Sequence, residues 1–251
     1  MGIFRMIYRF IGVSSVVVFT VIVYAIVRVL LFASPNLSKS TILSVARQGS
    51  RICCFILNIH ITMLGKPVNG SAPLIVSNHV GSLDILVLAA SFKTFFVSMA
   101  DVKGWPVIGW LSTLGGTIFV DRAKRHQVPH MIAAVSDLLK QGFSVALFPE
   151  GGATIGEIVG PFKSTPFEAA IRAAKPVLPI LVQYHDASSP SVACWANVNF
   201  KDHCLRIMKH PRLDVSIHVL PEITEPDRRA LAEHSHRLLH ETHQSTLATI
   251  E

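Results

Sequence analysis

Hydrophobic residues dominate the first thirty positions of the chain. Between Arg9 and Arg28 lie eighteen residues without a charge, FIGVSSVVVFTVIVYAIV, and VLLFA follows Arg28. A helix needs roughly 20 apolar residues to cross a bilayer core of ~30 Å, so this run is just long enough. We expect residues 1–35 to form a membrane-associated helix, a transmembrane helix or one partly submerged in the bilayer.

The residues around this run are typical of a membrane interface. Arg5, Arg9 and Arg28 are expected to extend toward lipid headgroups, and Tyr8 and Tyr24 suit the interface itself. The alternative is a cleaved signal peptide, because the start of the chain is basic and the core apolar. That core is longer than usual for a signal peptide and no convincing A-x-A cleavage site follows it, which favours the anchor.

A second hydrophobic pattern, with helical spacing, occupies residues 36–58. Apolar positions recur between Ser40 and Leu57, with Arg47 and Arg51 among them. This pattern predicts an amphipathic linking helix. Such a helix either lies against the membrane or packs as a plain core helix, and the sequence fits both interpretations.

From residue 59 onward, short apolar strands alternate with helical patterns. This alternation predicts an α/β fold, a mixed and mostly parallel sheet covered by helices, in one domain over residues 59–251. Strands are expected at 59–65, 72–78, 94–100, 117–122, 143–152, 176–185, 195–200 and 213–223, and helices at 85–92, 105–116, 128–142, 166–175 and 226–249.

Composition supports a membrane protein and argues against nucleic acid as a partner. Half of the residues are hydrophobic, 16% are charged where about 25% is usual, and the mean hydropathy is +0.47. The net charge is +7, yet no basic stretch interleaves with aromatic residues, so an anionic bilayer is the expected partner. Four cysteines without C-x-x-C spacing predict no structural zinc site and a reducing, cytoplasmic environment.

Three polar motifs follow predicted strands: SNHVGSLD, GTIFVDR and FPEGG. In the first, His79 and Asp84 are five positions apart, and a short turn would bring the carboxylate to one imidazole nitrogen. The carboxylate would fix the tautomer and leave the other nitrogen free to take a proton. No G-x-S-x-G nucleophile motif is present and Ser82 is expected to cap the next helix, so the pair suits activation of a substrate hydroxyl. The alternative is an ordinary strand-to-helix turn.

Four motifs in register resemble the glycerolipid acyltransferases typified by bacterial 1-acylglycerol-3-phosphate acyltransferase. The family signature is N-H-x4-D, then G-x-[IV]-F-[IV]-x-R, then F-P-E-G, then a proline-containing apolar strand. This chain has Asn78-His79-x4-Asp84, residues 116–122 (GTIFVDR), residues 148–151 (FPEG) and residues 176–180 (PVLPI). The resemblance covers roughly residues 60 to 222.

The resemblance implies a role for each matching residue. His79 would be the general base on the acceptor hydroxyl and Asp84 its partner, while Arg122 would hold an anionic headgroup. The remaining expected substrate-binding residues are Gly116, Phe119, Phe148, Pro149, Glu150, Gly151 and Lys163. The implied reaction moves a fatty acyl group from acyl carrier protein or coenzyme A to a lysolipid, without metal or cofactor. The implied location is the cytoplasmic side of a bacterial inner membrane.

Departures from the family pattern leave the acceptor open. Gly152, Ala153 and Thr154 replace the usual threonine, arginine and serine, and Met99 stands where relatives often carry lysine. Two basic groups are therefore missing near the expected headgroup site. A phosphatidic-acid branch and a lyso-ornithine-lipid branch both fit, and a non-catalytic lipid-binding relative is the rival from another class. The histidines of the last helix, His234, His236, His240 and His243, are expected on a solvated face.

Overall fold

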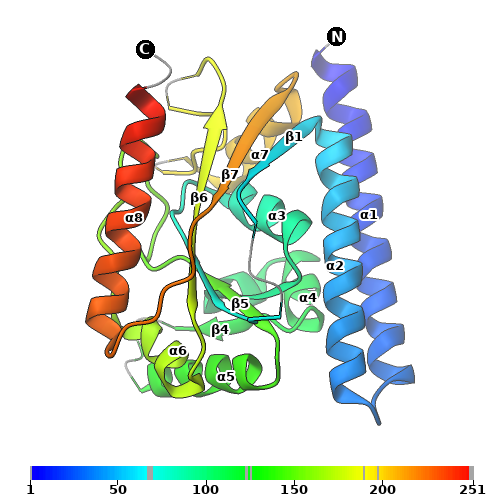
Figure 1. The fold of residues 1–251 in the computed structure, drawn as a ribbon. Helices are drawn as coiled ribbons and strands as arrows, with labels where there is room; N and C mark the ends of the chain where they lie inside the picture. The colour runs from blue at the N-terminus through cyan, green and yellow to red at the C-terminus, as the bar shows by residue number, and fades with distance from the viewer. Residues whose placement is uncertain are drawn as a thin grey trace.

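A seven-stranded sheet with helices on both faces forms the body of the protein (Figure 1). The computed structural model describes residues 2–66, 70–121, 124, 126–188, 190–196 and 198–248. The strand order is β1-β7-β6-β2-β5-β3-β4. The strands are β1 Ile59–Leu64, β2 Leu74–Ser77, β3 Thr94–Met99, β4 Ile118–Val120, β5 Ser144–Leu147, β6 Val177–His185 and β7 Leu213–Val219.

The sheet is mixed and mostly parallel, which confirms the predicted fold class. Strands β6 and β7 pair antiparallel, and the other strand pairs among the described residues are parallel. The central strands β2 and β5 are therefore flanked by parallel neighbours, and their carboxyl ends meet at one edge. Functional groups collect at such an edge in open α/β sheets.

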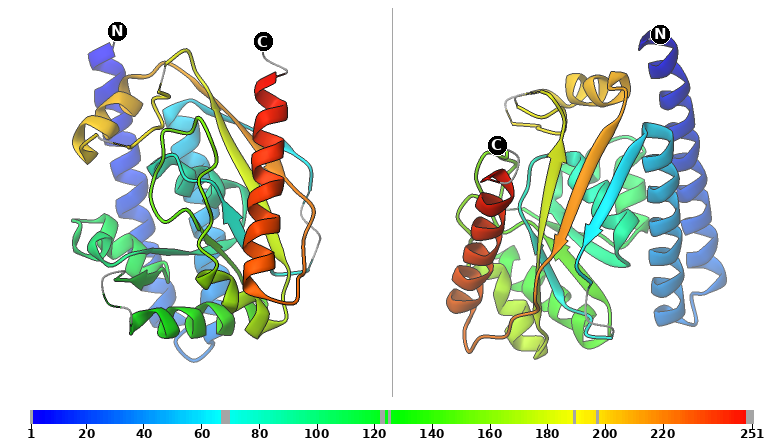
Figure 2. Two further views of the ribbon diagram at one scale, coloured as in Figure 1. Left: turned by 90° about the vertical axis from the view of Figure 1, so that its left-hand side faces the viewer. Right: turned by 45° about the horizontal axis from the view of Figure 1, so that its top comes forward.

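Helices cover both faces and extend beyond one side of the sheet (Figures 1 and 2). The helix α2 runs antiparallel to α1 and packs between it and the domain, whereas α8 lies on the opposite side. The helices are α1 Gly2–Leu30, α2 Pro35–Leu57, α3 Ser82–Ser91, α4 Ile108–Leu114, α5 Gln127–Lys140, α6 Glu168–Ala173, α7 Phe200–Lys209 and α8 Arg228–Ala248, with 3-10 turns η1 Ala100–Gly104 and η2 Thr165–Phe167.

Alternation along the buried strands divides the core into two layers. Successive side chains of a strand point to opposite faces of the sheet. In β2, Ile75 joins a cluster with α3 and the end of α2, whereas Leu74 and Val76 join a cluster with α5, α6 and α8. Because both faces are covered, β2 reads as a continuous apolar run rather than an alternating one.

Arg9 of α1 points into the protein, so the expectation that it extends toward lipid headgroups was wrong. Arg9 is 1% exposed, and its guanidinium donates to the carbonyl oxygens of Ile56 (3.1 Å), Met208 (3.3 Å), His210 and Pro211 (3.2 Å). These carbonyls lie at the carboxyl ends of α2 and α7, where helices carry partial negative charge. The buried cation is stabilised by helix ends instead of lipid phosphates.

The other two arginines and Tyr24 also contact the domain. Arg5 donates to the Lys209 carbonyl at 3.1 Å and Arg28 donates to the Leu114 carbonyl at 3.1 Å. Tyr24, expected at the interface, is 3% exposed in a small cluster with α2 and α4. The helix α1 is therefore bound to the domain at both of its ends.

One predicted strand is absent, and one helix was missed. Residues 195–200 form no strand in the part of the chain that the structure describes; Asn199 instead caps α7 by accepting a hydrogen bond from the Asp202 amide at 2.9 Å. The helix buries His203 and Ile207 against the core. The asparagine cap and the two buried positions four residues apart favour a helix after Asn199, although the sequence alternates as a strand would.

Candidate active site

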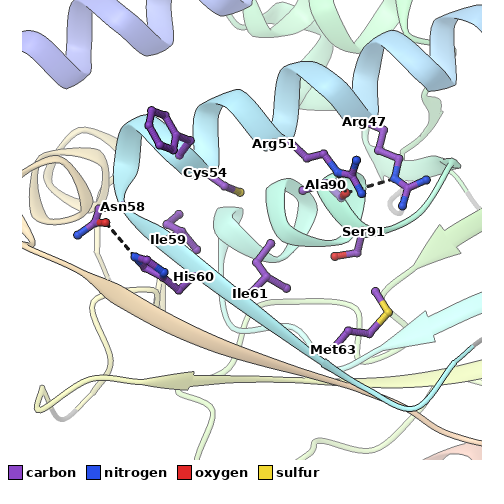
Figure 3. Close-up of a pocket in the computed structure, with 11 residues that line it drawn as sticks. Arg47, Arg51, Cys54, Asn58, Ile59, His60, Ile61, Met63, Ala90 and Ser91 are labelled. Atoms are coloured by element: carbon purple, nitrogen blue, oxygen red, sulfur yellow. Dashed lines mark hydrogen bonds between the residues drawn. The ribbon is translucent and has the colours of Figure 1, made fainter.

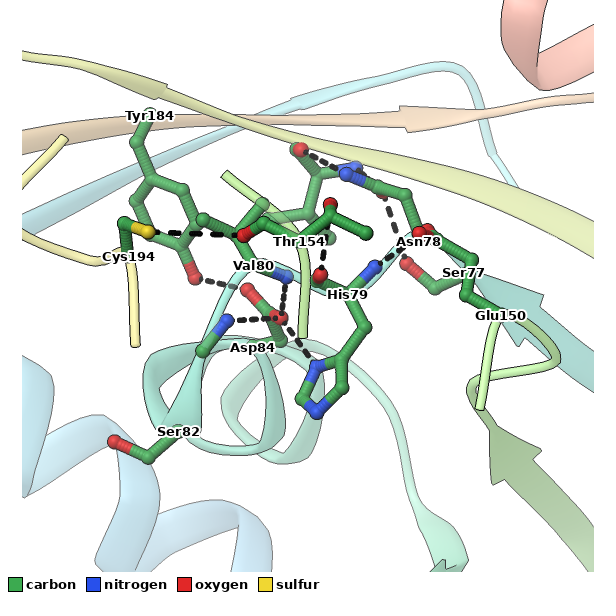
Figure 4. Close-up of polar contacts among 12 residues, drawn as sticks. Ser77, Asn78, His79, Val80, Ser82, Asp84, Glu150, Thr154, Tyr184 and Cys194 are labelled. Atoms are coloured by element: carbon green, nitrogen blue, oxygen red, sulfur yellow. Dashed lines mark hydrogen bonds and ion pairs between the residues drawn. The ribbon is translucent and has the colours of Figure 1, made fainter. Parts of the chain in front are cut away.

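The end of β2 places His79 at the carboxyl edge of the sheet. Beyond Ser77 the strand is bound to β6 by Asn78, whose side chain accepts from the Val182 amide at 2.8 Å and donates to the Val182 carbonyl at 2.9 Å. The next residue, His79, directs its Nδ1 toward Asp84, 2.8 Å from Oδ2 (Figure 4). Because a carboxylate accepts only, Nδ1 carries a proton, and in the neutral imidazole Nε2 therefore holds the lone pair.

Asp84 is completely buried and accepts four hydrogen bonds. Besides His79, its Oδ2 accepts from the amides of Val80 (2.7 Å) and Gly81 (2.9 Å), and its Oδ1 accepts from the Tyr184 hydroxyl at 2.6 Å. So many donors stabilise the ionised carboxylate in a buried position. Tyr184 could not be predicted as a partner of Asp84, since it lies one hundred residues away on β6.

The acid of this motif is both a helix cap and the partner of the histidine. Asp84 occupies the third position of α3 and accepts from the amide of Gly81, the N-cap residue. Ser82 was expected to cap this helix, and that prediction was wrong. Its hydroxyl instead bonds to Nε2 of His203 at 2.8 Å, which fastens the first turn of α3 to α7.

Phe148 and Glu150, from the turn after β5, complete the surroundings of His79. The rings of His79 and Phe148 stack with centroids 4.1 Å apart. Glu150 accepts from the His79 amide at 2.9 Å and from the Gly160 amide at 3.3 Å. Burial raises the pKa of Glu150, and these two hydrogen bonds lower it in part. The carboxylate therefore fixes backbone on both sides of the site.

The segment after Glu150 folds back over the motif. The Thr154 amide and hydroxyl both donate to the His79 carbonyl, at 2.8 and 3.2 Å. The Lys163 amide donates to the Pro149 carbonyl at 3.0 Å, and its ammonium lies beside Gly151. Gly151 has φ +84°, and a Cβ there would be 2.5 Å from the Lys163 Nζ, so glycine leaves room for this lysine.

The histidines of α8 hold this segment in place, so their expected position on a solvated face was wrong in part. His243 is 7% exposed and bonds to the Glu157 carbonyl at 3.0 Å, while His236 bonds to the Val159 carbonyl at 3.2 Å. In contrast, His240 is bonded to Gln244, one turn further along the helix. The two loop contacts act on the same segment that presents the Gly160 amide to Glu150.

The second sequence motif lies farther along the sheet. Phe119 is the middle residue of β4 and pairs with Ser98 of β3. Gly116 has φ +83° in the turn before β4, where a Cβ would be 2.8 Å from the Phe95 ring. Gly116 thus precedes a strand that β5 and β3 separate from β2, the strand that leads to His79. Arg122, expected to hold a headgroup, lies outside the described residues.

Together these groups can act as a proton acceptor on a half-buried surface. The His79 side chain is 17% exposed, and no other described residue hydrogen-bonds to its Nε2. A substrate hydroxyl can therefore approach that nitrogen while Asp84 stabilises the imidazolium. No group of three or more His, Cys, Asp or Glu side chains within the described ranges could hold a metal ion. The four cysteines are free, and three of them are buried.

Comparisons with known proteins identify the class to which this fold and site belong. Residues 59–183 match the family model described as Acyltransferase. A lyso-ornithine lipid O-acyltransferase of Brucella abortus is 32% identical over 200 residues, 72% of this chain and 75% of the relative. The chain belongs to the acyltransferase family.

Individual relatives carry two different names. A lyso-ornithine lipid O-acyltransferase of Rhodobacter capsulatus is 33% identical over 66% of both chains, and a 1-acyl-sn-glycerol-3-phosphate acyltransferase of Neisseria gonorrhoeae is 30% identical over 60% of both. The match therefore spans somewhat under two thirds of these two relatives. The crystal structure of the 1-acyl-sn-glycerophosphate acyltransferase PlsC of Thermotoga maritima has the same fold, with a TM-score of 0.72 over 98% of this chain and 96% of that one, at 15% identity.

Proposed function

We propose that this chain is a membrane-associated O-acyltransferase, which moves a fatty acyl group from a thioester to the hydroxyl of a lysolipid. The observation that carries the proposal is the hydrogen bond between His79 Nδ1 and the buried carboxylate of Asp84. It leaves Nε2 as a base beside a partly exposed surface, with no nucleophile of the protein in the motif. The thioester donor is acyl carrier protein or coenzyme A, and no cofactor or metal is required.

The proposed reaction is a direct transfer with the proton passing through His79. Nε2 takes the proton of the acceptor hydroxyl while that oxygen attacks the thioester carbonyl, and Asp84 stabilises the imidazolium. When the tetrahedral intermediate collapses, the carbon–sulfur bond breaks and the thiolate leaves. The imidazolium returns its proton to the thiolate, so that an ester and a free thiol are released and His79 is again neutral.

We propose lysophosphatidic acid as the acceptor, with lyso-ornithine lipid as the alternative. Lys163 supplies a cation beside Gly151, close to the turn that carries Glu150. Arg122 would contribute a second cation for a phosphate. The alternative is favoured by Gly152 and Ala153, which stand where the family pattern has an arginine and its neighbour, and by the names of two relatives described above.

The proposed attachment to the membrane is along its surface, on the cytoplasmic side of a bacterial inner membrane. The helix α1 is long and apolar enough to cross a bilayer, and its apolar side chains include Phe4, Phe19 and Ile22, each at least half exposed. Yet the same helix contacts α7 near its start and α4 near its end. An upright helix would carry those parts of the domain into hydrocarbon, so a partly submerged helix is the better orientation.

The test is an acyl-transfer assay with purified full-length protein in detergent micelles. Labelled acyl carrier protein and acyl-CoA donors are offered with lysophosphatidic acid or lyso-ornithine lipid, and the products are resolved by chromatography. We expect one acceptor to be esterified by the wild type, and at least a 10²-fold lower rate for His79→Ala. Unchanged turnover by a folded His79→Ala protein would exclude the proposed base. Absence of transfer to every lysolipid in the panel would favour the non-catalytic lipid-binding alternative.

A further inference from the structure

A cavity of about 430 Å³ lies between α2, β1 and the carboxyl end of α3 (Figure 3). Strand β1 is at the edge of the sheet and, among the strands that the structure describes, pairs with β7 alone, so this cavity is at the border of the domain. It lies at the opposite end of α3 from His79: the helix has ten residues, about 15 Å, and begins after His79, while Ala90 and Ser91 of its last turn line the cavity. None of the residues proposed above to bind substrate lines it.

Two arginines of α2 converge on one wall of the cavity. The Nε atoms of Arg47 and Arg51 both donate to the carbonyl of Ala90, at 3.4 and 3.1 Å, and their guanidinium groups lie next to each other (Figure 3). This contact uses one donor of each fork and leaves the Nη groups for another partner. Neither arginine forms an ion pair with a carboxylate anywhere in the described ranges.

The two charges are close enough to affect each other. Burial lowers the pKa of Arg47, and the positive charge of Arg51 lowers it further. An anion between the two forks would relieve this repulsion, and a guanidinium fork matches the oxygens of a phosphate in geometry. The Ala90 carbonyl of α3 holds the two arginines in position, but its partial negative charge does not neutralise two guanidinium groups.

The rest of the cavity wall combines the polar residues Asn58, His60 and Ser91 with apolar ones, some of them exposed. Phe55 is 84% exposed and Met63 is 40% exposed, and Ile59 and Ile61 line the same cavity from β1. Ile52, on the outer side of α2, is 42% exposed. A free phosphate ion would leave these apolar side chains exposed to water, whereas a lipid would bury them under the upper part of its acyl chains.

We propose that Arg47 and Arg51 bind the phosphate of an anionic membrane phospholipid, whose acyl chains pass over Phe55 and Met63. The ligand class follows from the paired cations beside exposed apolar side chains, on a helix that packs against α1. The site is separate from the catalytic surface and serves to hold α2, and with it the domain, at an anionic bilayer.

The test measures the binding of short-chain lipids to full-length protein in detergent micelles. Thermal unfolding is followed by tryptophan fluorescence with dihexanoyl-phosphatidylglycerol, dihexanoyl-phosphatidylcholine or inorganic phosphate. A ligand that binds the native state raises Tm in proportion to its occupancy. We expect phosphatidylglycerol to raise Tm and phosphatidylcholine and inorganic phosphate to leave it nearly unchanged.

The variant Arg47→Gln/Arg51→Gln should bind phosphatidylglycerol at least about tenfold more weakly, since two charge-assisted contacts are lost. The control Arg229→Gln/Arg237→Gln removes the same charge from exposed positions on α8, across the sheet, and should bind as the wild type does. The double variant also removes both contacts to the Ala90 carbonyl, so a second variant changes the exposed Arg51 alone. Arg51→Gln should lose less affinity for phosphatidylglycerol than the double variant does.

Three results would overturn the proposal. One is equal stabilisation of the wild type and both cavity variants by phosphatidylglycerol. The second is no stabilisation of the wild type by this lipid. The third is an equal shift with inorganic phosphate, which would reassign the arginines to a free ion. Retention of binding in Arg47→Lys/Arg51→Lys at reduced affinity would support the role of the planar forks over charge alone.

Discussion

The hydroxyl of Tyr184 donates a hydrogen bond of 2.6 Å to Oδ1 of Asp84, on the side of the carboxylate opposite His79. Burial, and then the charge of Asp84, raise the pKa of the tyrosine well above its usual value, so it stays a donor. Tyrosine, aspartate and histidine thus form a chain of hydrogen bonds from β6 to the surface of the site. In the proposed mechanism Tyr184 acts on His79 through Asp84 and is a positioning residue.

Replacing Tyr184 with Phe should alter the pH profile of transfer more than it alters folding. With one donor fewer, the carboxylate of Asp84 holds its negative charge less well and attracts the imidazolium more strongly. We expect the acidic limb of the kcat/KM profile to move to higher pH by up to about one unit, the equivalent of one hydrogen bond.

If Tyr184 only stabilised the fold, the shape of the pH profile would not change. In that case Tyr184→Phe would lower kcat/KM by the same factor at every pH, together with Tm. The matched control is Tyr8→Phe, which removes a hydroxyl from an exposed side chain on α1. An acidic limb that coincides with that of the wild type would exclude the proposed action on Asp84.

The raised pKa of Glu150 predicts that the folded protein loses stability as pH rises. Burial raises its pKa above the ordinary 4.5, so between the unfolded and folded values the native state binds more protons than the unfolded chain. Stability falls with pH wherever the native state binds the extra proton. The contribution of Glu150 to the free energy of unfolding is therefore fully present below pH 4.5. It is lost as pH rises through the raised pKa of the folded state.

The comparison with Glu150→Gln isolates this contribution. The amide oxygen can still accept from His79, but no second oxygen remains for the Gly160 amide, which lowers stability at every pH. We expect the Tm of the wild type minus that of Glu150→Gln to decrease between pH 4.5 and 7, as measured by thermal unfolding. A difference that grows with pH would show that the carboxylate is better stabilised folded than unfolded.

Arg9 should contribute more to stability than any other charge on α1. Arg9→Met keeps much of the apolar stem but leaves carbonyls of α2 and α7 without their donor in a buried region. Unsatisfied groups of this kind cost about 1–3 kcal/mol each, with partial recovery by relaxation, so we expect a loss of about 2–4 kcal/mol. Arg5→Met, which removes a single more exposed contact, should cost less than about 1 kcal/mol. Equal losses in denaturant titrations would contradict the assignment.

The motif around His79 could be predicted because the interacting groups are close in sequence. Five residues separate His79 from Asp84, and a strand followed by a helix fixes their approach. The partners that come from elsewhere could not be predicted: Tyr184 reaches Asp84 across the sheet, and His203 reaches Ser82 from a helix that resembled a strand. The catalytic roles of His79 and Asp84 stay predictions. So do the substrate-binding roles of the eight other residues that the sequence analysis singled out: Gly116, Phe119, Arg122, Phe148, Pro149, Glu150, Gly151 and Lys163.

The first helix shows a second limit of sequence reasoning. Hydropathy identified α1 as a helix able to enter a membrane, and the structure has a continuous helix there. It could not show that Arg9 faces the domain, because a helix carries arginine equally well on either side when the neighbouring surface is unknown. The carbonyls that bind this arginine belong to α2 and to α7, about 200 residues away.

Gly81 should tolerate no side chain, in contrast to Gly152. A Cβ at Gly81 would lie 2.1 Å from the Ala193 carbonyl oxygen, and backbone in the loop after β6 would have to move. That movement would also disturb the Gly81 amide, which donates to Asp84. We expect Gly81→Ala to lose about 3 kcal/mol or more of stability and nearly all transfer activity. A Cβ at Gly152 meets nothing within 4 Å, so Gly152→Ala should keep Tm and activity close to the wild type. Each variant adds one methyl group. Equal Tm values for the two variants would therefore mean that the loop after β6 does not pack against the turn that carries His79 and Gly81.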